Sequence, residues 1–169
     1  IQGAEYLISE FISDNGNYRK WIRSFFWRTG VLTSKVKKNA TDENKVYEMY
    51  YEFNEAIRAI KPHRVLAINR GETEKILTVD INVDESEIIK YLESNVITKD
   101  SCVTKYIKDA VADSYKRLIA PSIEREIRSE LTEIADDNAI NVFGENLENL
   151  LLIPPMKEKV VLGFDPAYR

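Results

Sequence analysis

The apolar residues of the N-terminal third recur at helical spacing. A first stripe ends before Asn15-Gly16, and a second predicts a helix over residues 18–29 with Gly30 at its C-terminal end. After a loop at residues 35–40, Thr41-Asp42-Glu43 favours the start of another helix. The apolar face that follows predicts about four helical turns and consists of Val46, Met49, Tyr50, Phe53, Ile57 and Ile60.

Strict alternation of apolar and polar residues occurs at residues 77–83 and predicts a strand with one buried face. Asp84 and Glu87 then match a capping box, which favours a short helix after the strand. Helical spacing returns over residues 103–118 and again over residues 123–151, with a break or kink expected near Pro121 between them.

The last residues, 159–164, are typical of a buried strand that is cut off. Together the patterns predict a mostly α fold, with a multihelical domain over residues 1–158 that contains a small β element. Residues 159–169 would then be a truncated C-terminal strand that opens a second domain. Because the chain does not begin with Met, we expect it to be a piece of a longer protein.

Composition removes several classes of function. The chain has 169 residues with one Cys and one His, which excludes an intramolecular disulfide framework, a Cys-rich zinc site and paired-His metal motifs. No apolar run reaches the ~20 residues of a membrane span, and the first residues lack the pattern of a secretory signal. We therefore expect a cytoplasmic protein with no membrane partner.

Charge is distributed unevenly along the chain. The net charge is −4, and all 28 Asp and Glu residues lie outside residues 15–40. Such an uneven distribution of charge fits a surface that faces an anion, either a nucleic acid or an acidic protein partner. The basic residues of this acid-free stretch are Arg19, Lys20, Arg23, Arg28, Lys35, Lys37 and Lys38.

Trp27 lies on the basic face of the helix predicted over residues 18–29. At 100° per residue it falls one turn after Arg23 and opposite the apolar face, so we expect the indole to face solvent. Three interpretations stay open. The indole could stack on a nucleobase while the cations hold phosphates, pack against a neighbouring domain, or be capped by Arg23 as a cation–π pair.

Other chemistry-bearing residues are better explained by structure. His63 stands near a predicted helix start, and Cys102 is interpreted as a buried or incidental thiol. Because no Gly-rich phosphate loop is present either, we expect no enzyme activity, no metal and no cofactor. Two carboxylate pairs one turn apart lie among Lys and Arg and favour solvated faces with intrahelical ion pairs: Asp109 with Asp113, and Glu126 with Glu130.

Four segments resemble the Tex family of bacterial transcription accessory proteins, and together they cover nearly the whole chain. His63–Gly71 and the strand after it resemble the family's HRxLAxxRG segment, and Tyr115–Glu133 resembles its AYKRLLAPSIEREIR helix pair. Asn146–Pro155 is similar to its ENLxxLLLxPP linker. Val160–Arg169 looks like the first strand of its YqgF domain, a ribonuclease-H-like module.

The resemblance implies an elongated, mostly helical, cytoplasmic parent protein that binds nucleic acid chiefly through a C-terminal OB-fold. It implies that the YqgF domain, helix-hairpin-helix elements and the OB-fold follow the region seen here. Asp165 matches the first acid of a ribonuclease-H-like site, but Ala167 stands where the family pattern has Gly. Because family members generally look degenerate there, we assign Asp165 no catalytic role.

We therefore expect a non-enzymatic helical scaffold of a Tex-like transcription accessory protein that contributes to binding RNA or DNA, with the transcription machinery as a further partner. The alternative is a protein–protein or interdomain docking module without direct nucleic-acid contact. The cut strand also favours dimerisation or disorder at residues 159–164. The candidate contacts to nucleic acid are Arg19, Lys20, Arg23, Trp27, Arg28, Lys35, Lys37 and Lys38.

Overall fold

The computed structural model describes residues 2–38, 40, 42–43, 45–99, 101, 103–154 and 157–165. The chain forms mainly helices with one small sheet, so the predicted fold class is confirmed. In chain order the elements are α1 (Gln2–Ser13), α2 (Gly16–Thr29), β1 (Val31–Val36), the 3-10 turn η1 (Glu48–Tyr50), β2 (Glu52–Ala56), α3 (Pro62–Thr73), β3 (Leu77–Asn82), α4 (Glu85–Val96), α5 (Thr104–Asp113), the π-helical segment η2 (Ser114–Ile119) and α6 (Ala120–Leu151).

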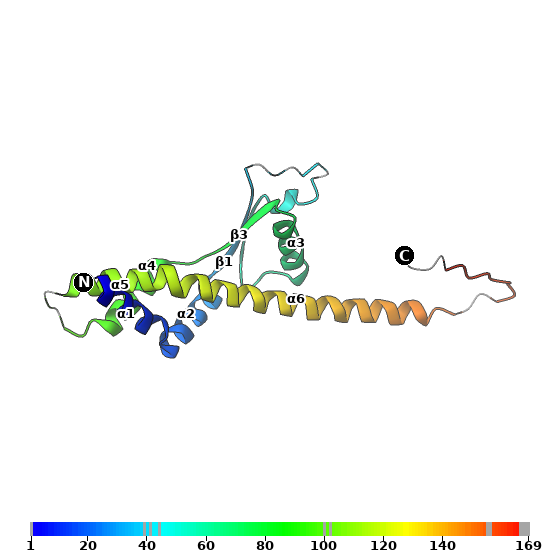
Figure 1. The fold of residues 1–169 in the computed structure, drawn as a ribbon. Coiled ribbons are helices and arrows are strands. Elements are labelled where there is room, and N and C mark those ends of the chain that lie inside the picture. The colour runs from blue at the N-terminus through cyan, green and yellow to red at the C-terminus, as the bar shows by residue number, and fades with distance from the viewer. Residues whose placement is uncertain are drawn as a thin grey trace.

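The sheet has the order β2-β1-β3, and both pairings are antiparallel. Leu32 of the central strand lies opposite Glu55 on one side and Ile81 on the other. β3 alternates buried and exposed residues from Leu77 to Asn82, which confirms the predicted strand. Figure 1 shows the sheet and α3 together on one side of the long helix α6.

The helix predicted after Thr41 is wrong. Residues 52–56 form the edge strand β2 instead, and Val46 and Met49 are exposed. Phe53 and Ile57 fit a period of two as well as a helical period, and β1 supplies a strand partner about twenty residues earlier in the chain. The loop predicted from residue 35 likewise begins too early, because β1 continues to Val36.

Asp42 organises the turn that replaces that helix. Its carboxylate accepts the backbone N–H groups of Val46 at 3.0 Å and Tyr47 at 2.9 Å, and the hydroxyl of Tyr51 at 2.9 Å. The backbone bond from Tyr47 is the main reason why the pKa of Asp42 is lowered. An acid that the sequence favoured as a helix start therefore closes a compact turn before β2.

The kink expected near Pro121 is present as the π-helical segment η2, which joins α5 to α6. Proline has no N–H to donate to the preceding turn, and a π-helical widening is one way in which a helix accommodates that loss. Two buried serines fasten this junction to α1. Ser9 Oγ donates to the carbonyl of Ala110 at 3.1 Å, and Ser114 Oγ donates to the carbonyl of Ser9 at 2.7 Å.

Residues 157–165 form neither helix nor strand, so the strand predicted over residues 159–164 is not formed in the described part of the chain. Val160, Leu162 and Phe164 are exposed there. A strand needs a neighbour for its backbone hydrogen bonds, and the register of β1, β2 and β3 includes no residue of this segment. Its assignment to a YqgF domain stays a prediction, and Ala167 and Cys102 lie outside the described residues.

Candidate nucleic-acid interface

Helix α2 carries the first half of the basic stretch, and its predicted core face is confirmed. The helix begins at Gly16, where the side chain of Asn15 accepts the backbone N–H of Asn17 at 3.0 Å. Ile22 and Phe25 are buried. Trp21 stacks on Tyr91 of α4, with ring centroids 3.7 Å apart and planes within 7°.

The opposite face of α2 packs against α6 through three consecutive polar contacts. Arg19 Nη2 donates to Ser122 Oγ at 2.7 Å, and the Trp27 indole N–H donates to Glu130 Oε2 at 3.1 Å. Between these, Arg23 forms an ion pair with Glu126. In all three contacts the partners are 103 residues apart, so the two helices run parallel and stay in register over these turns. We call this set the α2–α6 ladder.

The expectation that Trp27 faces solvent is wrong. Its side chain is half-buried and packs against the core, and its polar atom is already bonded to Glu130. None of the three interpretations of Trp27 includes α6 as the partner. Helical geometry gave the direction of the indole correctly, but the helix that covers this direction is about a hundred residues further along the chain.

The interpretation of Glu126 and Glu130 as members of intrahelical ion pairs is also wrong, because both bond to α2. The spacing of these residues in the sequence does indicate a contact between the two helices. Glu126 and Glu130 are one turn apart, as are Arg23 and Trp27, so the two helices can match turn for turn. For the other acid pair the interpretation is confirmed at Asp113, which accepts Arg117 Nη2 at 2.8 Å and has its pKa lowered mainly by that bond.

The remaining candidate cations are not used in this way. Among the residues that the structure describes, no ion pair involves Lys20, Arg28, Lys35, Lys37 or Lys38. Four of these side chains are exposed and that of Lys37 is half-buried. The guanidinium of Arg28 lies 5.6 Å from the centre of the Phe25 ring, which leaves its N–H groups available to a ligand.

These five cations follow the chain from α2 along β1 and into the turn after it. At ~1.5 Å per helical residue and ~3.3 Å per strand residue, the path from Lys20 to Lys38 is about 40 Å long. They are therefore spread along one stretch of the chain instead of being gathered in a single turn. We call Lys20, Arg28, Lys35, Lys37 and Lys38 the cationic strip.

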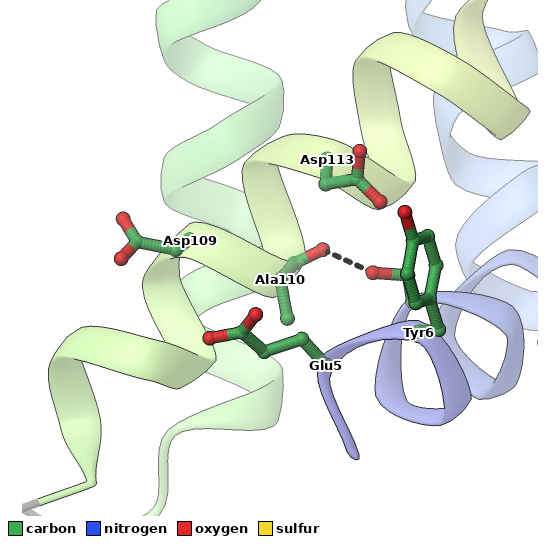
Figure 2. Close-up of a pocket in the computed structure, with 6 residues that line it drawn as sticks. Glu5, Tyr6, Asp109, Ala110 and Asp113 are labelled. Carbon is green, nitrogen blue, oxygen red and sulfur yellow. Dashed lines mark hydrogen bonds between the residues drawn. The ribbon is translucent and has the colours of Figure 1, made fainter. Parts of the chain in front are cut away.

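A cavity of about 260 Å³ lies between α1 and α5, and Figure 2 shows Glu5, Asp109 and Asp113 around it. Carboxylates at its rim repel phosphate, so the cavity does not extend the cationic strip. Among the described residues, no group of three or more His, Cys, Asp or Glu side chains is placed to hold a metal ion. Within the same residues, no helix is both long enough and apolar enough to cross a bilayer.

The segment from His63 to Gly71 has visible structural roles. His63 is exposed in the first turn of α3, while Arg64 bonds to Glu55 of β2 at 2.7 Å. A Cβ at Gly71 would lie 2.7 Å from Leu77 Cδ1 and 3.0 Å from Tyr47 Cδ1, so glycine lets α3 approach the start of β3.

Polar contacts also tie α3 to α6. Asn69 Nδ2 donates to Thr132 Oγ1 at 2.8 Å, and Arg128 pairs with Glu72. The side chain of Glu124 reaches the free edge of β3 and accepts the backbone N–H of Ile81 at 3.0 Å. Burial raises the pKa of Glu124. α6 thus contacts α2, α3 and the sheet.

The whole chain is similar in sequence to known proteins. The family model described as Tex central region-like matches residues 1–143. The Bacillus subtilis (strain 168) protein YdcI is 53% identical over 171 residues, which is 100% of this chain and 24% of YdcI.

Two further relatives carry descriptive names. The transcriptional accessory protein Tex of Neisseria gonorrhoeae is 30% identical over 100% of this chain and 23% of its own length. The human S1 RNA-binding domain-containing protein 1 is 32% identical over 99% of this chain and 18% of its own length. The chain thus spans about a quarter or less of these relatives, and the resemblance of its motifs to the Tex family is confirmed: the chain belongs to the Tex central region-like family.

Proposed function

We propose that this chain is a non-enzymatic helical scaffold within a transcription accessory protein, and that the cationic strip contacts the backbone of RNA or DNA. Two relatives support the direction of the proposal, since one is named a transcriptional accessory protein and another an S1 RNA-binding domain-containing protein. The transcription machinery as a further partner and the cytoplasm as the compartment belong to the same proposal.

The observation that carries the proposal is the exposure of the cationic strip. It lies within residues 15–40, where the sequence contains no Asp or Glu. Lys and Arg contact phosphates without regard to base sequence, and each contact releases counterions. Arg19 and Arg23 are engaged with α6, so they are withdrawn from the candidate contacts together with Trp27. The cationic strip then provides at most five phosphate contacts.

The test is a titration of the chain with single-stranded RNA and with duplex DNA over a series of salt concentrations. If three to five phosphates are neutralised, log K should fall against log salt with a slope between about −2.5 and −4.5 on duplex DNA. Absence of binding at about 50 mM salt, or a slope near zero, would remove the strip as an interface and leave the docking alternative. Hydrolysis of either nucleic acid by the chain with Mg²⁺ would contradict the non-enzymatic part.

A matched pair of triple variants separates local contact from overall charge. Replacing Lys35, Lys37 and Lys38 with Gln should weaken binding by at least about 10-fold and reduce the salt slope by about 2 to 3. The control replaces three exposed lysines outside the strip, Lys90, Lys105 and Lys116, with Gln. Because the two variants have the same net charge, equal losses in both would show that the strip has no special role.

A further inference from the structure

The second half of α6 is exposed to solvent, and none of the described residues covers it. From Asp136 to Pro154 every residue is exposed, whereas the first half of the helix is buried at Ile123, Ile127, Leu131 and Ala135. Figure 1 shows this half projecting beyond the sheet and the other helices. The exposed half is more than four turns long, which is ample for packing against another helix.

The exposed half has an apolar ridge with the same spacing as the buried half. The buried residues are spaced four apart, and the same spacing continues along Ala139, Phe143, Leu147 and Leu151. Residues four apart form the ridge that helices most often use when they pack together. Each step of four residues turns about 40° around the helix axis, so Phe143 and Leu151 lie about 80° and 160° around the helix from Ala135. They are 67% and 74% exposed and belong to an apolar surface separate from the face that packs in the core.

The charge of this half determines which partner fits. Residues 136–154 contain no Lys, Arg or His, and their acids are Asp136, Asp137, Glu145 and Glu148. Such a helix repels nucleic acid and anionic membranes, and it repels a second copy of itself. An apolar ridge flanked by acids is complementary to a helix whose own apolar ridge is flanked by Lys and Arg.

We propose that the second half of α6 docks a basic amphipathic helix from another part of the same polypeptide, outside residues 1–169. A segment of the same polypeptide is the favoured partner, because tethering raises its effective concentration at the ridge. Relatives that contain a matching segment are about four times as long as it, so they have ample sequence from which to supply the helix. The inference does not depend on nucleic-acid binding.

The chemistry of the surface is tested with a labelled synthetic probe, a 21-residue peptide that forms an amphipathic helix with a Leu ridge flanked by Lys. Fluorescence anisotropy should show that it binds the chain, and that a counterpart with Glu in place of Lys binds at least about 10-fold more weakly. Equal binding of the two peptides, or binding of neither, would overturn the proposal.

Variants locate the contact on the ridge. Phe143→Ser combined with Leu147→Ser should weaken probe binding by at least about 10-fold, because it removes the centre of the apolar ridge. Val142→Ser is the control, since Val142 is also exposed but lies off the ridge, and it should change binding by less than about 2-fold. A chain that dimerises through Phe143 and Leu147 would assign the surface to a second copy and contradict the proposed occupant.

The source of the helix is tested on the full-length polypeptide. If its own helix already covers the ridge, the Lys probe should bind at least about 10-fold more weakly than to the chain of 169 residues, and backbone amides over residues 136–151 should exchange at least about 10-fold more slowly. Equal probe binding and equal exchange in the two forms would show that the partner is not part of the same polypeptide.

Discussion

The side chains that join α2 to α6 show how a basic face can become an internal contact. Arg23 and Glu126 keep 40% and 33% of their side chains exposed, so solvent screens their attraction and the pair adds little by charge alone. The indole of Trp27 is different, because it packs against the core and donates a directed hydrogen bond to Glu130. Trp27 should therefore be the member of the α2–α6 ladder that matters most for stability.

Trp27→Phe keeps an aromatic ring and removes the N–H donor. We expect a loss of about 0.5 to 1.5 kcal/mol in the free energy of unfolding, measured by urea denaturation, while Trp27→Ala should cost about 3 kcal/mol or more. Lys20→Met, at an exposed position of the same helix, serves as the control and should change stability by less than about 0.5 kcal/mol. A Trp27→Ala variant of unchanged stability that fails to bind nucleic acid would restore the stacking interpretation.

Glycine substitutions separate close packing from helix propensity. Gly71→Ala places a methyl group 2.7 Å from Leu77 Cδ1 and should destabilise the protein by about 1 to 3 kcal/mol. Gly144→Ala is the matched control in another helix, where a Cβ would meet nothing within 4 Å. Because alanine favours a helix interior, that variant should stabilise by up to about 1 kcal/mol. Thermal denaturation of both proteins measures the difference, and equal effects would contradict a packing role for Gly71.

At the scale of elements, the sequence predicts those features that depend only on residues close together in the chain. The period of β3, the cap at Asp84 and the apolar face of α2 each depend on neighbouring residues, and all three are confirmed. β2 was missed because its apolar residues fit two periods, and only its pairing with β1 decides between them. The α2–α6 ladder could not be predicted from α2 alone, because its other half begins at Ser122.

Contacts between elements also control the response to pH, through Glu124 between α6 and β3. Burial raises its pKa above the ordinary value of 4.5. The folded state therefore holds this proton more tightly than the unfolded state does, and the stability that this gives is present below pH 4.5 and lost as pH rises through the raised pKa. Glu124→Gln keeps an oxygen that can accept the N–H of Ile81 but does not titrate.

We therefore expect the variant to gain stability relative to the natural protein as pH rises above 4.5, because only the natural protein must then bury a charge. Urea denaturation over a pH series measures the difference between the two free energies. Asn149→Gln, a substitution without a titrating group at an exposed position of the same helix, should show no such trend. A constant difference at every pH would mean that Glu124 titrates alike in the folded and unfolded states.

At the scale of the whole molecule, α6 divides into a half that packs against other elements and a half that is exposed along its whole length. Its first half contacts α2, α3 and the sheet, whereas residues 136–154 are exposed throughout. Sequence resemblance was sufficient to identify the family, and the helical period was sufficient to predict a helix up to residue 151. Neither shows which half of that helix is covered, because both halves have the same apolar spacing.

Removing residues 138–169 tests this division. The deleted part has no buried residue in the described chain, so the shortened protein should keep a cooperative urea transition and lose less than about 1 kcal/mol of unfolding free energy. Removing residues 1–13 is the opposite case, because it deletes buried Ile12 and the contacts of Ser9 with α5, and it should abolish the cooperative transition. Loss of cooperative unfolding on removal of residues 138–169 would mean that the exposed half of α6 supports the domain itself, and the partner proposed for its ridge would then no longer be required to explain why that half exists.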